Sequence, residues 1–155
     1  MNVPSQIAKH FREVIFEGNW TASNLKTQLA DVTWEEAAHQ RQPFHSIATL
    51  TFHINYYVEA VTRVLQGGPL EAHDQFSFDA PEIKGADDWI QLRDHVFSCA
   101  ETFAALVEKM PDERVWQDID DPKYGIYYRN LHGIIEHTHY HLGQIAILKK
   151  LLRSP

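Results

Sequence analysis

Apolar residues recur at steps of three and four along most of the chain, the spacing that puts side chains on one face of an α-helix. The alternating pattern typical of β-strands is scarce. The periodicity therefore predicts an all-α fold with four long helices. Because the chain has 155 residues and a hydrophobic content of 44%, we expect residues 1–155 to form a single domain around one core.

The first helical segment carries apolar residues from Val3 to Val32 and is interrupted at Gly18-Asn19. The sequence "TWEE" then places Thr33 three residues before Glu36. At this spacing each side chain can accept a hydrogen bond from the other residue's backbone N–H, so a short helix is expected to start there.

The second long helix is expected to begin between Pro43 and Ser46 and to end at the "GGP" of residues 67–69. From Leu70 to Gly85 the helical pattern fails. A connection of this length is unusual between neighbouring helices joined by a tight turn, so it indicates a crossover.

The third long helix is expected to be capped by Asp87 and Asp88 and to end at Pro111, and the last to run from about Arg129 to Leu152. Between them, "VWQDIDDPKYGIYY" contains turn signals and has room for a small hairpin.

Charge and composition exclude several classes of function. The formal charge of −7 and the pI of about 5.7 offer no basic surface for nucleic acid. The sequence has no run of 18 apolar residues and no apolar signal segment near its start, so neither membrane insertion nor secretion is expected. A single cysteine, Cys99, cannot form an internal disulfide and is interpreted as a core residue. A cytoplasmic location is expected.

Three histidines lie within five residues of the last helix, in "IIEHTHYHLGQ". At about 100° per residue, His137 and His141 project about 40° apart and one turn up the helix, so they form a pair. His139 lies about 200° from His137 and points away. The pair shares its face with aliphatic residues such as Ile134 and Ile145, and burying it there without partners would cost about 1–3 kcal/mol per group.

The second long helix offers a third imidazole, because His53 shares its inward face with Leu50 and Val64. Three neutral imidazoles that leave coordination positions open are typical of catalytic metal sites. The alternative is that each histidine binds a carbonyl or carboxylate in the core. For His53 alone that alternative is favoured, and for the pair His137 and His141 the two readings stay open.

Two further side chains are candidates for supporting the metal ligands. Tyr57 lies one turn beyond His53, and Gln144 lies close to His141. No general base is identified. Glu136 points about 100° from His137 and is interpreted as a solvated flanking residue, and Thr138 stands where zinc proteases of the H-E-x-x-H type have a glutamate.

The remaining histidines and the tryptophans receive structural interpretations. His45 is interpreted as a helix-start residue. The tryptophans are expected to be mostly core anchors. The other histidines share no ligand spacing with a partner and are expected to face solvent or satisfy single contacts; they are His10, His39, His73, His95 and His132.

The segments "LTFHINYYVEAVTRVLQGG" and "HGIIEHTHYHLGQIAILKKLL" resemble the second and last helices of the DinB-like (YfiT-like) proteins, in which one histidine precedes a later H-x-x-x-H-x-G-Q-I motif. The similarity extends over the whole chain. It implies a four-helix bundle with up-down-down-up topology, a long crossover between helices two and three, and a metal bound by His53, His137 and His141. It also implies a homodimer.

Three hypotheses follow. The leading one is a metal-dependent enzyme acting on a small molecule, either a hydrolase or a transferase that uses a low-molecular-weight thiol. The second is a metal-binding stress or storage protein without turnover. The third is a helical interaction module without metal. Zinc or nickel is the favoured ion, and iron and manganese also accept imidazole nitrogen.

Overall fold

The computed structural model describes residues 2–154 and contains six α-helices and three short 3-10 helices. No β-strand occurs within this range, so the expected all-α class is confirmed. The α-helices are α1 (Val3–Ile15), α2 (Leu25–Leu29), α3 (Trp34–Ala38), α4 (Ile47–Leu65), α5 (Ala86–Glu108) and α6 (Tyr127–Arg153). The 3-10 helices are η1 (Asp74–Phe76), η2 (Asp112–Trp116) and η3 (Pro122–Tyr124).

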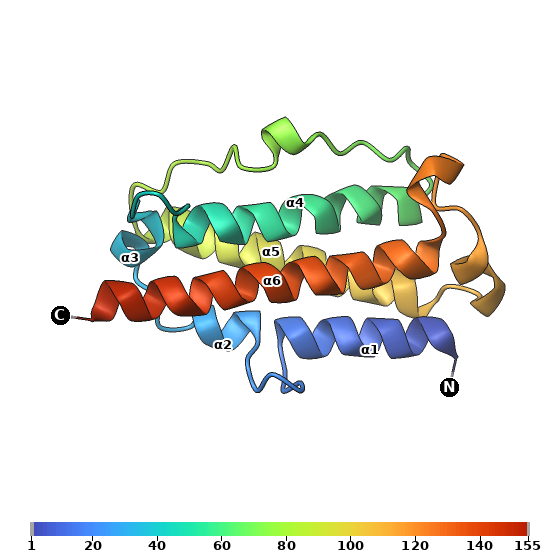
Figure 1. The fold of residues 1–155 in the computed structure, drawn as a ribbon, viewed down its shortest axis with the longest axis horizontal. Coiled ribbons are helices and arrows are strands. Elements are labelled where there is room, and N and C mark those ends of the chain that lie inside the picture. Colours follow the sequence, from blue (N-terminus) through green and yellow to red (C-terminus); the bar gives the residue numbers. More distant parts are fainter. Residues whose placement is uncertain (1, 155) are drawn as a thin grey trace.

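The four long helices α1, α4, α5 and α6 lie lengthwise beside one another (Figure 1). α4 and α5 run in one direction, while α1 and α6 run in the opposite direction (Figure 1). Both α4 and α1 pack against α5 and α6. Because α4 and α5 are parallel, the chain must return along their length. Residues 66–85, hereafter the crossover, do so over the outer side of α4 (Figure 1).

The ends of α4 follow from its flanking residues. Ser46 caps the N-terminus by accepting a hydrogen bond from the backbone N–H of Thr49 at 3.1 Å. At the other end, Gly67 has a φ of +92°, which an L side chain rarely adopts, and the N–H of Gly68 bonds the carbonyl of Arg63 at 2.9 Å. Both boundaries agree with the prediction from the sequence.

The predicted cap of α5 is wrong, because the helix begins before Asp87 and Asp88. The helix begins at Ala86, and Gly85 occupies the N-cap without a side-chain hydrogen bond. Asp87 and Asp88 lie inside the first turn, where their charges still complement the helix dipole. The Asp88 carboxylate accepts a hydrogen bond from the backbone N–H of Lys84 at 2.9 Å.

The expected break in the first helical segment and the expected short helix both occur. The chain leaves helical geometry after Ile15 and resumes it at Leu25. α3 starts with the predicted capping box, in which Thr33 and Glu36 each accept a hydrogen bond from the other's backbone N–H. The possible hairpin is reduced to a single bridge between Asp118 and Ile126 around η3.

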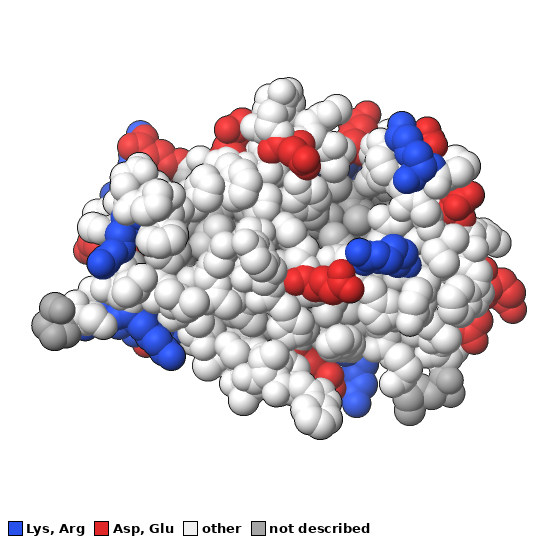
Figure 2. All heavy atoms as spheres, in the orientation of Figure 1, with Lys and Arg blue, Asp and Glu red and all other residues white. Residues whose placement is uncertain are grey.

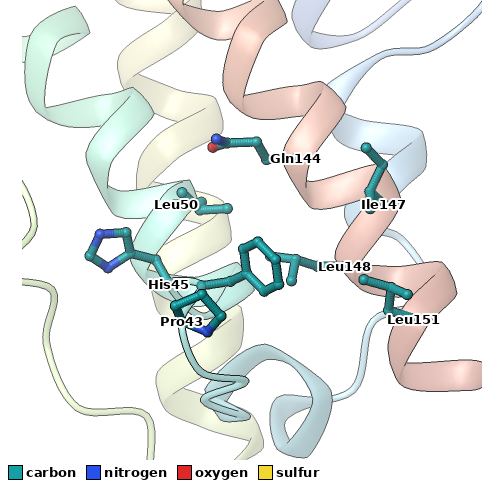
Figure 3. A pocket seen from close by; sticks show the side chains of 8 residues that line it. Pro43, His45, Leu50, Gln144, Ile147, Leu148 and Leu151 are labelled. Atoms are coloured by element: carbon teal, nitrogen blue, oxygen red, sulfur yellow. The ribbon is translucent and has the colours of Figure 1, made fainter.

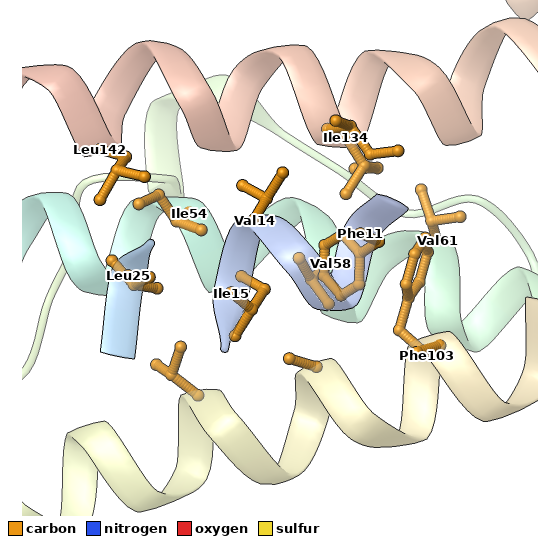
Figure 4. Packing of buried hydrophobic residues seen from close by; sticks show 14 of the residues in the cluster. Phe11, Val14, Ile15, Leu25, Ile54, Val58, Val61, Phe103, Ile134 and Leu142 are labelled. Carbon is orange, nitrogen blue, oxygen red and sulfur yellow. The ribbon is translucent and has the colours of Figure 1, made fainter. Parts of the chain in front are cut away.

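Side chains from all four long helices form one hydrophobic cluster (Figure 4). The ring of Phe11 on α1 lies 4.6 Å from that of Phe103 on α5, and both side chains are fully buried. Trp89 is a core anchor whose indole N–H donates to the carbonyl of Val32 at 2.9 Å. Trp20 and Trp116 are not core anchors, because Trp20 is exposed in the loop between α1 and α2 and Trp116 is exposed at the end of η2.

On the face shown in Figure 2, acidic and basic side chains are interspersed among uncharged ones. Within residues 2–154, no helix combines the length and apolar character needed to cross a lipid bilayer.

Candidate metal centre

The structure brings His53 of α4 together with His137 and His141 of α6. One ring nitrogen of each residue lies within 4.8 Å of those of the other two. The Nε2 atoms of His53 and His137 are 3.0 Å apart, although the two residues are 84 positions apart in the sequence. His53 and His141 are buried and His137 is half-buried. Three imidazoles from two adjacent antiparallel helices therefore converge on one point.

His139 does not take part. Its ring lies 6.2 Å from that of His10 on α1. Four residues separate His137 from His141, which places them one above the other, whereas a two-residue step carries His139 to another side of the helix.

Hydrogen bonds determine which ring nitrogen of His53 and of His141 would bind a metal ion. His53 Nδ1 lies 3.0 Å from the backbone carbonyl of Ser77, and His141 Nδ1 lies 2.7 Å from Oε1 of Gln144. Because these oxygens only accept, each Nδ1 carries the proton and each Nε2 keeps its lone pair. Gln144 thus contacts the ring of His141 from one turn further along α6.

The donor set fits a divalent transition metal. Imidazole nitrogens bind such ions at about 2.0–2.1 Å, so two of them on one ion are about 2.9 Å apart at a right angle and about 3.4 Å apart at the tetrahedral angle. The 3.0 Å separation of the His53 and His137 nitrogens lies within this range. At this distance the neutral His137 ring can donate its Nε2–H to the His53 Nε2 lone pair, and an ion would replace that shared proton.

Residues of the crossover cover the His53 ring. Phe78 stacks on it with a centroid distance of 3.8 Å and an interplanar angle of 8°. His45 stacks with Phe78 at 4.3 Å. His45 therefore precedes α4, as expected for a helix-start residue, but it also belongs to the aromatic surround of the centre.

Burial keeps the three imidazoles neutral. It is the main reason that the pKa of His137 falls from the ordinary 6.5 to about 4, with further lowering by His141 and His53. Burial also lowers the pKa of His53 and of His141. A neutral imidazole is the form that binds a metal, so the fold prepares the ligands for binding at neutral pH.

A cavity of about 530 Å³, hereafter the His137 cavity, opens beside the centre. It is lined by Tyr57, Ala60, Val61, Leu70, Ala72, Asp74, Tyr124, Arg129, Asn130, Gly133, Ile134 and His137. The hydroxyl of Tyr57 donates to Asp74 Oδ1 at 2.6 Å. Tyr57 therefore lies beside the ligands as expected, with its ring 4.9 Å from that of His137, but its hydroxyl is bound to a carboxylate.

A smaller pocket of about 290 Å³ lies further along α6 towards the C-terminus. Gln144 on α6 and Leu50 on α4 contribute to its walls (Figure 3). Its other lining residues are mostly apolar, and they include Phe44, Ile147 and Leu151.

Two sets of residues near functional groups escaped the sequence analysis. Asp74, Ser77 and Phe78 belong to the irregular crossover, where no periodicity indicates which way a side chain points. The interpretation of Cys99 as core is wrong, because it is only half-buried and its sulfur lies 3.6 Å from His95 Nε2. The four-residue spacing of His95 and Cys99 was the signal that could have revealed this pair.

Comparison of the chain with protein-family models, characterised proteins and solved structures found no match.

Proposed function

We propose that the chain is a metal-dependent enzyme acting on a small molecule, with a divalent ion held by His53, His137 and His141. One observation carries the proposal. Two of the three imidazoles give their Nδ1 protons to protein acceptors, so their Nε2 atoms keep lone pairs that can bind an ion where the three rings meet. A divalent ion on three imidazoles supplies Lewis acidity, which acidifies a bound water or thiol and polarises a carbonyl.

The His137 cavity is the proposed substrate site. Its volume of about 530 Å³ lies in the range of small-molecule pockets, and its walls are mainly apolar. Val61, Leu70 and Ile134 suit an apolar part of the substrate, while Arg129 offers donors to a carbonyl or carboxylate group. The substrate class is therefore a small molecule with an apolar portion and an acceptor group.

Asp74 is the proposed proton acceptor. It shares the cavity with His137, and the Tyr57 hydroxyl bonds one of its oxygens and orients it. Burial and the neighbouring Asp74 raise the pKa of Tyr57, so Tyr57 remains a donor and positions the carboxylate. Glu136 is less suitable, because it is exposed and paired with Arg129 at 3.1 Å.

The proposal includes the features implied by the DinB-like resemblance. The helix directions in Figure 1 support an up-down-down-up bundle, and the crossover supports the long connection between the second and third long helices. The reaction would be a hydrolysis or the transfer of a low-molecular-weight thiol. Zinc or nickel would be the ion, with iron or manganese as substitutes, in a cytoplasmic homodimer.

Metal content and turnover test the proposal together. His137→Ala should lose one ion per chain relative to the wild type, whereas His139→Ala should lose none, as measured by elemental analysis. Protein loaded in turn with zinc, nickel, iron and manganese is then assayed with small esters, amides, and electrophiles supplied with a thiol. We expect turnover that is absent in His137→Ala and reduced in Asp74→Asn at unchanged metal content.

Equal metal loss from His137→Ala and His139→Ala would contradict the ligand assignment. Turnover that survives His137→Ala would place the chemistry elsewhere. Metal binding without turnover in any loaded form would favour a storage or stress protein.

A further inference from the structure

A second group of metal-ligating side chains lies on the α5 side of α4. Glu59 comes from α4, and His95 and Cys99 lie one turn apart on α5. Glu59 Oε1 is 2.6 Å from His95 Nε2 and 3.5 Å from Cys99 Sγ, and the sulfur is 3.6 Å from the same nitrogen. One oxygen, one nitrogen and one sulfur therefore face a common point.

The two distances to sulfur are those of a tetrahedral zinc site. With a Zn–S bond of about 2.3 Å and bonds to nitrogen or oxygen of about 2.0–2.1 Å, the sulfur lies about 3.5 Å from the other ligand atoms. The contact between Glu59 and His95 is a hydrogen bond that would open to about 3.3 Å around an ion. Their side chains are 34% and 59% exposed, so this movement leaves the core undisturbed.

A buried polar atom beside the group lacks a partner. Asn55 lies one turn before Glu59 on α4, and its side-chain amide lies beside the Cys99 thiol. Asn55 is only 3% exposed, yet its Oδ1 accepts no hydrogen bond from any residue in 2–154. Native proteins rarely leave a buried acceptor unpaired, so this oxygen is suited to contact a bound ion or water. The group also lines a cavity of about 370 Å³, through which an ion can enter.

The arrangement differs from that of a cysteine nucleophile activated by histidine. In such a site the carboxylate and the nucleophile use opposite nitrogens of the imidazole. Here Glu59 binds Nε2, and the sulfur is nearer to Nε2, at 3.6 Å, than to Nδ1, at 3.9 Å. Convergence on one nitrogen favours a shared ion.

We propose that Glu59, His95 and Cys99 form a second metal site, independent of the histidine centre and suited to zinc. The mixed set of thiolate, imidazole and carboxylate matches the ligands that zinc accepts, and three protein ligands leave a fourth position for water.

Cobalt(II) is a spectroscopic probe that can distinguish the two sites. The chain has a single cysteine, so a sulfur-to-cobalt charge-transfer band can arise only at Cys99. We expect metal-stripped wild-type protein to bind two cobalt ions per chain, one of which produces the band. Cys99→Ser should lose the band and one ion, while His137→Ala should keep the band and lose the other ion.

Two ligand variants complete the test. His95→Gln and Glu59→Gln should each lower the affinity for cobalt, measured by titrating the band. The expected loss exceeds the 10–100-fold caused by removing an outer hydrogen-bonding partner of a ligand. His95 is exposed, and circular dichroism verifies that each variant is folded. A wild-type protein without the band at saturating cobalt would overturn the proposal. So would a band that titrates in both variants as it does in the wild type, because the thiol alone would then bind the ion.

Discussion

Acid should destabilise the metal-free protein by an amount that His137 makes calculable. Its pKa is about 4 in the fold, whereas an imidazole in an unfolded chain has a pKa near 6.5. Between these values the unfolded chain binds a proton that the folded chain does not, so the free energy of unfolding falls as the pH falls. The contribution is complete above pH 6.5 and lost below about pH 4. At 1.36 kcal/mol per tenfold change in proton affinity, it amounts to about 3 kcal/mol.

The assay is urea unfolding of chelator-treated wild type and His137→Gln between pH 7.5 and pH 4. Glutamine cannot titrate, and the acidic groups and the histidines outside the centre affect both proteins alike. We expect the stability difference between the two proteins to change by about 3 kcal/mol over this range, which is a large share of a typical folding free energy. Parallel stability curves would refute the reasoning, because they would show that His137 is not held neutral by the fold.

Three further substitutions test the centre and the fold. Gln144→Met removes the acceptor for His141 Nδ1 and should weaken metal binding about 10–100-fold in a chelator competition. An unchanged affinity would show that Gln144 does not orient His141. Phe103→Ala empties a fully buried position against Phe11 and should cost about 3–5 kcal/mol in urea unfolding; a loss below about 1 kcal/mol would contradict the packing described. Thr33→Ala removes the capping box and should cost about 1 kcal/mol, which a matched thermal melt would detect, and an unchanged melting temperature would count against the cap.

Local chemistry explains why most of the helices could be predicted. The stop at Gly67 and the caps at Ser46 and Thr33 depend on a few neighbouring residues, so the sequence contains the whole signal. At α5 the acidic pair is a plausible cap, but the N-cap is Gly85, two residues before Asp87, and the pair lies inside the helix. The exposure of Trp20 does not follow from the sequence, because it depends on a loop that no neighbouring element covers.

The same distinction applies to the candidate centre. Helix geometry alone pairs His137 with His141. His53 can be added to the pair because it lies on the inward face of the second long helix. Irregular backbone has no periodicity from which the direction of a side chain can be predicted. The contacts of Ser77 and Phe78 with His53 could therefore not be anticipated. Cys99 was assigned to the core from its place beside an apolar face, although packing against α4 turns it towards Glu59.

The crossover has a consequence for protein engineering. Ser77 fixes the tautomer of His53, and Phe78 covers its ring, although both belong to a segment without regular structure. Grafting three histidines onto another helical scaffold would reproduce the ligands without the groups that aim them. A designer who wished to transplant this centre would have to carry a length of loop along with the helices, and trimming that loop would be a way to disable the centre while leaving every ligand intact.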